Sequence, residues 1–337
     1  MTRVLHRYCL FLSMATFCLL TAGALVTSHD AGLSAPDWPL SYGQVFPKMV
    51  GNLFWEHGHR LVATTVGTLT IGLVLYLYRY PLWRFLQRVT GLRARGSVTA
   101  DEPPLWLRRL GLIALGAVIT QGLLGGLTVK LLLPWWVSTA HATLAQLFFC
   151  TVVSLAVLTS PRWSKEAGTP QIRPSTRLHY LELLAVGTIF LQLVLGATLR
   201  HSATWDQELP RELVLAHIGG AFVVTVAVTT VAITTLRQRA AEPYLTRPAW
   251  LLLMLLGAQL VLGLGSYLTR VNSPNDPQPL PPMIGVTVAH VACGALVFAT
   301  CIVLTFRSLL LESREECTDL PRAFSELCGK ELEGTPS

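Results

Sequence analysis

A glutamate and a histidine stand at the mouth of a long apolar segment, where ionisable side chains are costly to place. Glu56 and His59 lie just before the uncharged stretch 61–78, within the sequence Glu-His-Gly-His-Arg at residues 56–60. Three residues apart on a helix, the two side chains share one face, whereas His57 points about 100° away from Glu56. Because ionisable residues in membrane-length segments are usually functional, the spacing predicts a site that contains Glu56 and His59.

Three more histidines occupy matching places further along the chain. His141, His217 and His290 each lie near the start of a long apolar segment, as His59 does. At a rise of 1.5 Å per residue, the fourth to sixth helical residue lies about 6–9 Å below the membrane surface. The four imidazoles are therefore predicted to share one layer near the outer face of the membrane, two in each half of the chain.

The repetition favours haem ligation over other uses of a membrane histidine. A single one is more often a structural residue or a step in a proton path, and a relay would need acids and bases across the whole membrane. A structural zinc site uses about four close ligands, commonly including cysteine, and no cysteine shares this layer. Two imidazoles facing each other across a four-helix bundle are typical of bis-histidine haem sites. The pattern predicts haem iron as the metal at all four histidines.

One difference separates the two halves. Glu56 precedes His59 by three residues, whereas Val214 stands at the same place before His217. A carboxylate beside only one ligand predicts that chemistry takes place in the N-terminal half, with Glu56 as a general base or proton acceptor. The C-terminal half would then hold a stable electron-transfer haem. The alternative is that Glu56 orients His59 or pairs with Arg60.

Eight apolar segments must position these residues. The chain of 337 residues is 52% hydrophobic and 13% charged, against about 25% charged in soluble domains. Each segment has roughly the 17–25 residues that span a bilayer core, and the first is too long for the core of a signal peptide. The sequence predicts an all-α polytopic membrane protein with spans at residues 8–28, 61–78, 110–129, 137–160, 183–199, 213–236, 249–269 and 283–306.

Basic residues indicate the orientation of the spans. Lys and Arg are concentrated in the segments that share a side with the N-terminus, including seven arginines between residues 79 and 109. Both termini are therefore predicted to be cytoplasmic, in a bacterial-type inner membrane. Because the basic residues lie between apolar runs, no nucleic-acid partner is expected. The seven cysteines lie in the spans or the C-terminal tail, which predicts no disulfide in an outer loop.

The two halves of the chain resemble each other. Val-x-x-Ala-His begins at both Val137 and Val286, and the third and seventh spans both close in a glycine-rich turn. An even number of spans per half predicts parallel topology about an axis along the membrane normal. We expect two pseudo-repeated four-helix bundles at residues 1–160 and 161–310, followed by a charged cytoplasmic tail at 311–337.

Two further stretches allow two interpretations each. Prolines flank Asp37 and Trp38, which favours a fixed turn, and Trp38 is either an interfacial residue or a lid over a ligand. Glycines in the stretch 121–128 (Gln-Gly-Leu-Leu-Gly-Gly-Leu-Thr) either let helices approach closely or leave room for a flat ligand. Close helix packing is the favoured interpretation of the second stretch.

Together, these motifs resemble the heme A synthase family over all eight spans. The resemblance rests on Glu56-x-x-His59-Arg60, residues 32–40 (Gly-Leu-Ser-Ala-Pro-Asp-Trp-Pro-Leu), the stretch 121–128, and the three Ala-His entries at His141, His217 and His290. It implies conversion of heme O to heme A, in which a porphyrin methyl becomes a formyl group for cytochrome oxidase. This is a four-electron oxidation, by two successive hydroxylations and loss of water.

The resemblance also implies a role for each predicted site residue. His59 and His141 would hold the substrate heme O, with the catalytic Glu56 beside it. His217 and His290 would ligate a haem b, the cofactor that passes electrons away. The expected partners are heme O, heme O synthase, cytochrome oxidase assembly factors, membrane lipid and an electron acceptor that the sequence does not identify.

The chain departs from the family pattern in its loops. Many relatives carry a cysteine pair in the first outer loop, where this chain has Ala35 and Ser41, and a second pair of some relatives is missing from residues 199–212. A mechanism that needs these thiols is therefore excluded. An arginine common at the end of the first span is also missing. Arg200 and Arg270 are candidates for the haem propionates, although extension to the membrane surface is the favoured interpretation of both.

Two other functions compete with this enzyme. A di-haem b-type electron carrier would have two equivalent sites, which the single Glu56 argues against. A haem-handling or insertion protein would need access from both faces of the membrane, whereas the histidine layer is predicted near the outer face only.

Overall fold

Eight long helices dominate the structure, a computed structural model that describes residues 3–90, 102–166, 177–202, 209–272 and 279–319. Each has the length and composition to cross a membrane, which confirms the predicted all-α class with eight candidate spans. They are α1 (Arg3–Ser28), α2 (Leu53–Thr90), α3 (Leu105–Lys130), α4 (Trp135–Leu158), α6 (Arg177–His201), α7 (Arg211–Gln238), α8 (Pro243–Val271) and α9 (Pro281–Asp319), with the short α5 (Pro161–Glu166) after α4.

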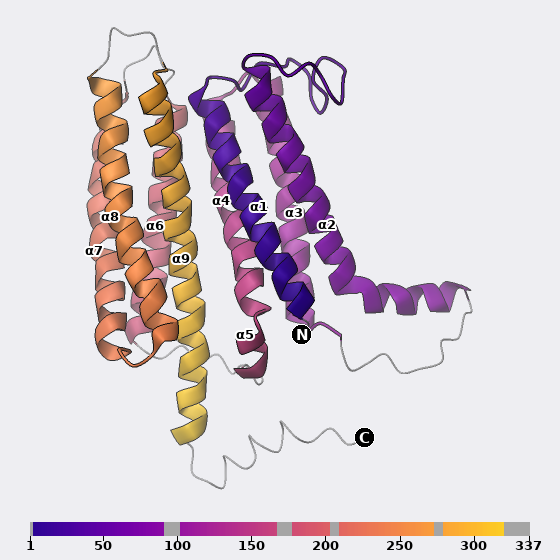
Figure 1. The fold of residues 1–337 in the computed structure, drawn as a ribbon, viewed down its shortest axis with the longest axis vertical. Helices are drawn as coiled ribbons and strands as arrows, with labels where there is room; N and C mark the ends of the chain where they lie inside the picture. The colour runs from indigo at the N-terminus through magenta and orange to yellow at the C-terminus, as the bar shows by residue number, and fades with distance from the viewer. Residues whose placement is uncertain (1–2, 91–101, 167–176, 203–208, 273–278, 320–337) are drawn as a thin grey trace.

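The long helices pack as two groups of four that lie side by side (Figure 1). In the first group, α1 and α3 each pack against both α2 and α4. In the second group, α6 and α8 each pack against both α7 and α9. The groups meet where α9 contacts α1 and α4 and where α4 contacts α6, so α4 and α9 are the most buried of the eight helices.

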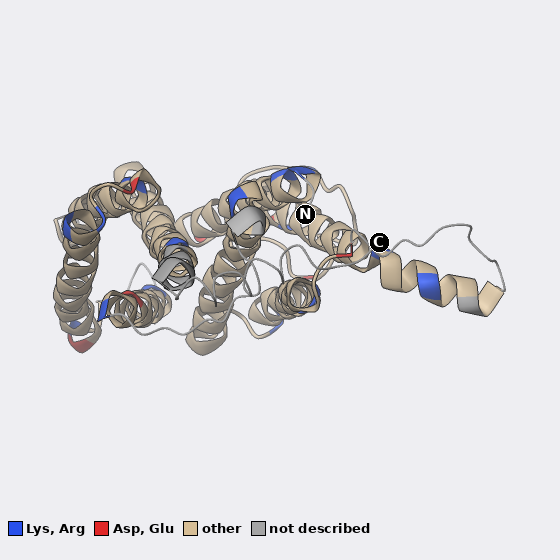
Figure 2. Cartoon of the chain, turned by 90° about the horizontal axis from the view of Figure 1, so that it is seen from below, with Lys and Arg blue, Asp and Glu red and all other residues tan. Residues whose placement is uncertain are grey.

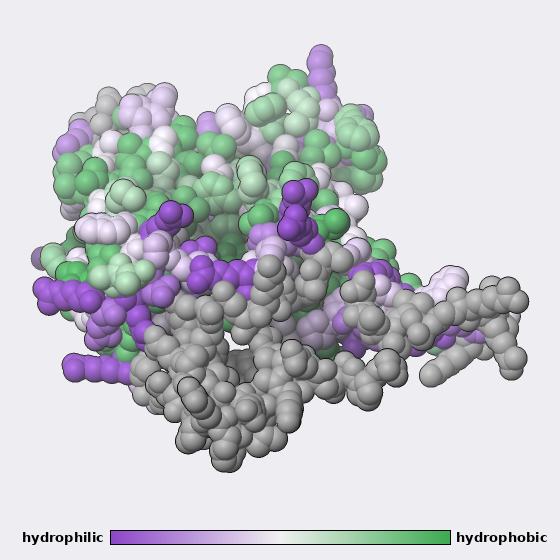
Figure 3. Space-filling model, turned by 60° about the horizontal axis from the view of Figure 1, so that its bottom comes forward, coloured by the Kyte–Doolittle hydropathy of each residue, from purple (hydrophilic) through white to green (hydrophobic). Residues whose placement is uncertain are grey.

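Apolar side chains fill both groups and also cover their outer sides. The first core includes Leu12 and Leu155, and the second includes Val228 and Leu252, all nearly inaccessible. Outward-facing residues are also large and apolar, and Phe222 is 70% exposed. Figure 3 shows hydrophobic residues over the sides of the molecule and hydrophilic residues gathered toward one end. Apolar outer surfaces of this kind are compatible with contact with lipid, because lipid tails are as apolar as these side chains.

Two helices continue more than ten residues past the predicted ends of their spans. α2 continues past residue 78 to Thr90, and Figure 1 shows its last turns running sideways, away from the other helices. Pro81 lies in this part of α2, and a proline inside a helix removes one hydrogen bond and kinks the axis. α9 continues past residue 306 to Asp319. The predictions ended at the first charges, which mark the end of an apolar run rather than the end of a helix. Residues 320–337 of the predicted tail lie outside the described residues.

Candidate functional site

His217 and His290 face each other in the second group of helices. They lie in the second turn of α7 and the third turn of α9, with ring centroids 6.3 Å apart and planes at 79°. A bond from a histidine nitrogen to a metal ion is about 2 Å long, so this separation leaves room for one ion between the two rings. The structure thus brings these two predicted ligands together.

His59 and His141 are the corresponding residues of the first group, on α2 and α4. Both side chains are partly buried, on two helices that each pack against α1 and α3. The Nδ1 atom of each ring is buried and has no hydrogen-bond partner among the described residues. Because an unpaired buried polar atom is costly, these nitrogens point to a ligand or proton acceptor at the site.

Each of the four histidines packs its ring edge against a glycine of the preceding long helix. A methyl group placed on that glycine would approach the Cε1 atom of the ring to between 2.8 and 3.2 Å. The pairs are Gly23 with His59, Gly125 with His141, Gly196 with His217, and Gly263 with His290. The glycines therefore leave space for the imidazole rings. For the stretch 121–128 this is a more specific role than the two predicted ones, close helix packing or room for a flat ligand. Its next glycine, Gly126, accommodates the indole of Trp38.

Three glutamines complete this arrangement, and the sequence analysis missed them. Gln121 and Gln192 donate from Nε2 to the carbonyl oxygens of His141 and His217, at 3.0 and 2.8 Å. The carbonyl oxygen of Gln259 accepts from Nδ1 of His290 at 3.2 Å. Each glutamine lies four residues before the glycine that contacts the histidine. The motif Gln-x-x-x-Gly, present in α3, α6 and α8, could therefore have identified these glutamines from the sequence. In α1 the same position holds Leu19.

The donor set fits a haem iron better than a structural zinc ion. Within the described part of the chain, no group of three or more His, Cys, Asp or Glu side chains could hold a metal ion. A haem needs only two axial ligands from the protein. Because Nδ1 of His290 donates to a carbonyl oxygen, the lone pair on its Nε2 is the one that could bind a metal, as in metal-binding histidines, and Nε2 of Gln259 lies 3.4 Å from it. Two bis-histidine haem sites therefore suit these residues.

Glu56 lies one turn before His59 and is almost fully buried, with 4% of its surface exposed. Its Oε2 atom accepts a hydrogen bond from the backbone N–H of Ala35 at 2.9 Å, and its Oε1 atom pairs with the guanidinium of Arg60. The carboxylate is therefore part of an ion pair, as the structural alternative expected. This pairing fixes its position and leaves its catalytic role a proposal.

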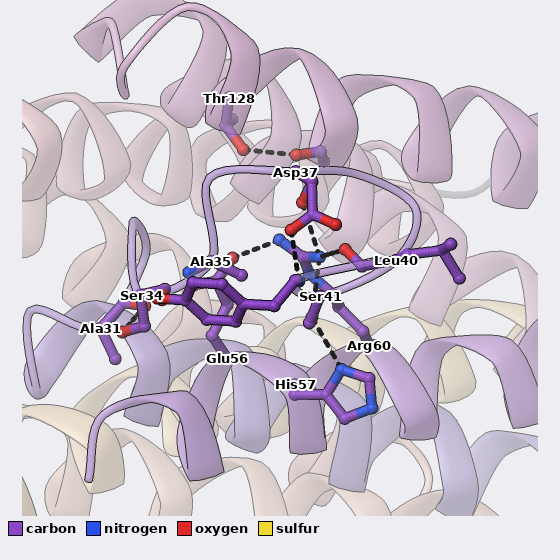
Figure 4. A network of polar contacts seen from close by, with 12 residues as sticks. Ala31, Ser34, Ala35, Asp37, Leu40, Ser41, Glu56, His57, Arg60 and Thr128 are labelled. Atoms are coloured by element: carbon purple, nitrogen blue, oxygen red, sulfur yellow. Dashed lines mark hydrogen bonds and ion pairs between the residues drawn. The ribbon is translucent and has the colours of Figure 1, made fainter. Parts of the chain in front are cut away.

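Arg60 forms hydrogen bonds that hold the outer loop between α1 and α2 over the carboxylate of Glu56 (Figure 4). Its Nη1 atom donates to the carbonyl oxygens of Asp37 and Leu40 and to Oγ of Ser41. His57 also holds the loop, with Nδ1 2.9 Å from Oγ of Ser41 and Nε2 3.0 Å from the carbonyl oxygen of Val45. His57 thus serves the loop and not the histidine pairs, in agreement with its predicted direction.

The turn around Asp37 is closed by its own carboxylate. Oδ1 and Oδ2 accept hydrogen bonds from the backbone N–H groups of Tyr42 and Gly43, at 2.7 and 2.8 Å. The hydrogen bond from Gly43 is the main cause that lowers the pKa of Asp37 below its ordinary value. Burial opposes it, and the bond from Tyr42 and the positive charge of Arg60 lower the pKa further. The ionised carboxylate therefore stabilises this loop.

Arg200 connects the two groups of helices, and its predicted extension to the membrane surface is wrong. From α6 it reaches α1, where Nη2 donates to the carbonyl oxygen of Ala24 at 2.9 Å and to Oγ of Ser28 at 2.8 Å. Its Nη1 atom is buried without a partner among the described residues. The guanidinium thus lies inside the molecule.

Three proteins named heme A synthase are similar to this chain. The one from Chelativorans sp. (strain BNC1) is 25% identical over 359 aligned positions, which cover 87% of this chain and 88% of that protein. Those from Alkalihalophilus pseudofirmus and Shouchella clausii are 24% and 26% identical over 204 residues, 60% of this chain and 61% of each relative.

A family model described as cytochrome oxidase assembly protein (COX15-CtaA) matches residues 48–302, most of the chain. The matched region contains Glu56 and all four paired histidines. The resemblance predicted from the motifs is confirmed by this match and by the three named relatives. This chain belongs to the COX15-CtaA family of cytochrome oxidase assembly proteins.

Proposed function

We propose that this protein is a heme A synthase, a membrane oxidoreductase that converts the porphyrin methyl group of heme O to the formyl group of heme A. One observation carries the proposal. Two pairs of histidines are held by the same glycine contacts, but among the described residues only one pair lies beside a buried carboxylate, which is fixed by Arg60 and by the outer loop.

The two halves take different roles in this proposal. The N-terminal half, residues 1–160, binds the substrate heme O through His59 and His141. The C-terminal half, residues 161–310, holds haem b through His217 and His290, and this bis-histidine haem supplies one-electron transfer. The recurring Gly–His contacts support a pseudo-repeat of two bundles with parallel topology. Both termini would lie in the cytoplasm and the histidine layer near the outer face of the inner membrane, as the distribution of basic residues favours.

Glu56 is the group that handles protons in this assignment. Oxidation of a methyl to a formyl group removes four electrons and, where water supplies the oxygen, four protons. One helical turn before His59, Glu56 is the described carboxylate placed to accept protons beside the substrate site. Arg60 and the N–H of Ala35 hold it in one orientation.

Two rival functions make different predictions. A di-haem electron carrier needs no carboxylate at either site, and a haem-handling protein needs no oxidation of its cargo. Both rivals would leave the porphyrin methyl group unchanged. The single Glu56–Arg60 pair beside one histidine pair favours the enzyme over either rival.

Co-expression with a heme O synthase tests the proposal. The membranes are extracted and their haems are identified by mass spectrometry, with cells that express the heme O synthase alone as the control. We expect heme A only where both proteins are present. The enzymatic proposal fails if the purified protein carries haem b and heme O but no heme A, because that result describes a carrier or handling protein.

A further inference from the structure

A second polar site lies at the opposite end of the molecule from the histidine pairs, where α1 begins and α9 ends (Figure 1). A cavity of about 560 Å³ lies there, lined mainly by α8 and α9 and reached by one residue of α5. Three arginines line it, Arg162, Arg247 and Arg307, and none of the described lining residues is acidic. Figure 2, viewed from this end, shows Lys and Arg on both groups of helices.

A proline explains why Arg307 points into the cavity. Pro248 lies inside α8 and has no N–H to donate to the carbonyl oxygen of Tyr244, four residues earlier. That oxygen instead accepts a hydrogen bond from Nη1 of Arg307 at 3.0 Å. The Nε atom of Arg307 is buried and has no partner among the described residues. Arg307 is therefore held in place by one bond and still has a donor to offer.

Two of these arginines make cation–π contacts with the aromatic ring of Tyr244. The guanidinium carbons of Arg162 and Arg307 lie 3.9 and 4.4 Å from its ring centroid. Each contact is favourable, but cations this close repel each other in a medium of low dielectric constant. Arg247, one turn along α8, adds a third charge at the cavity wall. An anion bound at Arg247 and Arg307 would offset part of this positive charge.

The other end of the cavity is mainly apolar, with Thr300 as its one described polar residue. Leu251 on α8 and Ala299 and Val303 on α9 continue the lining away from the arginines, toward the middle of the membrane. Ala299 and Arg307 are eight residues apart on one helix, a distance of about 12 Å. The cavity is therefore charged at the membrane surface and apolar inside the membrane, which matches a ligand with an anionic head and a hydrocarbon chain.

We propose that this cavity binds an anionic phospholipid. The phosphodiester would accept hydrogen bonds from Arg307 and Arg247, and one acyl chain would lie along Leu251, Ala299 and Val303. Inorganic phosphate has the same acceptor oxygens but nothing to fill the apolar part. A zwitterionic lipid brings its own cation close to the arginines. Both should therefore bind less well than an anionic lipid of the same chain length.

Native mass spectrometry of the full-length protein in detergent tests this proposal. Dioleoyl phosphatidylglycerol and dioleoyl phosphatidylcholine are added separately, and the retained lipid per protein is measured. The test variants are Arg307→Gln and Arg247→Gln, and the matched control is Arg237→Gln, an exposed arginine in the last turn of α7 at the same end of the same group. Arg247 is exposed, so its replacement is not expected to disturb folding.

We expect wild type and Arg237→Gln to retain phosphatidylglycerol in preference to phosphatidylcholine. Either test variant should lower that retention about tenfold, the loss expected for a charge-assisted hydrogen bond. Equal retention of the two lipids by wild type, or unchanged phosphatidylglycerol retention in Arg247→Gln, would overturn the proposal. Displacement of the lipid by millimolar inorganic phosphate would also overturn it, because free phosphate would then be the ligand.

Discussion

The contact between a glycine and an imidazole is the smallest repeated unit of this protein. It occurs four times, and in each case the glycine lies on the long helix before the one that carries the histidine. A side chain at the glycine would occupy the volume of the ring edge, so the contact fixes where the imidazole can lie. The position of each proposed haem ligand therefore depends on a residue that has no polar group of its own.

Gly196→Ala should for this reason weaken haem b binding without removing a ligand. The new methyl carbon would lie 2.8 Å from Cε1 of His217, and such overpacking costs about 1–3 kcal/mol, roughly tenfold or more in haem affinity. The matched control is Gly187→Ala on the same helix, where the methyl group meets no atom within 4 Å. Absorption spectra of the reduced protein measure the retained haem b, with His217→Ala as the reference for its loss. Equal haem content in both glycine variants would contradict the prediction.

Glu56→Gln should stop turnover and keep haem b. The amide has the size of the carboxylate and can still accept from Ala35, but it cannot take a proton at neutral pH, so heme A formation should fall by about 10²–10⁴. Mass analysis of the extracted haems measures the product and any hydroxylated intermediate. Asp37→Asn is the control, since it weakens the same loop and leaves Glu56 in place. An unchanged yield in Glu56→Gln would reduce this residue to a structural partner of Arg60.

At the scale of elements, the outer loop between α1 and α2 is organised by hydrogen bonds and not by covalent links. The two positions where many relatives have cysteines both take part in the network around Glu56. Ala35 donates its backbone N–H to Glu56, and Ser41 contacts both His57 and Arg60. A network of this kind depends on the charges of its members, so its stability should depend on pH.

Acidification should loosen this loop through Asp37. Its pKa is lowered in the folded protein, so its ionised form adds stability above about pH 4, the ordinary value, and that stability is lost as the pH falls through the lower folded value. Hydrogen exchange of the peptide containing Tyr42 and Gly43, corrected for the intrinsic rate, should rise in that range. Asp37→Asn should exchange faster at neutral pH and lose this pH dependence. Asp30→Asn, an exposed neighbour, should behave as wild type, and a shared response of both variants would argue against the assignment.

The spans and the histidines could be predicted because their signals are local. A run of about 20 apolar residues has few alternatives to a membrane helix, and four histidines at matching depths are recognisable one segment at a time. The ends of α2 and α9 could not be predicted, since an arginine continues a helix as well as leucine does. The direction of Arg200 depends on Ser28, 172 residues away, and no local pattern contains that contact.

At the scale of the whole molecule, Arg200 lies between the two histidine pairs. On α6 it follows by four residues Gly196, the glycine that holds His217. On α1 it binds the carbonyl oxygen of Ala24, the residue after Gly23, which holds His59. The bond that joins the two groups of helices therefore connects the backbone supports of both proposed haem sites.

Arg200→Gln should lower the midpoint potential of haem b while both haem sites stay filled. Arg200 lies one helical turn after Gly196, which packs against His217, and a nearby cation favours the reduced, less positive haem. If the partly screened interaction between this charge and the haem is about 1 kcal/mol, its removal lowers the midpoint potential by about 43 mV for a one-electron couple. Spectroelectrochemical titration measures the potential, and haem content confirms that the sites are intact. Arg211→Gln, an exposed arginine in the first turn of α7, is the control and should leave the potential unchanged. If the two variants have the same midpoint potential, the buried charge of Arg200 does not influence the haem of the C-terminal half. The role of Arg200 is then limited to joining the two groups of helices.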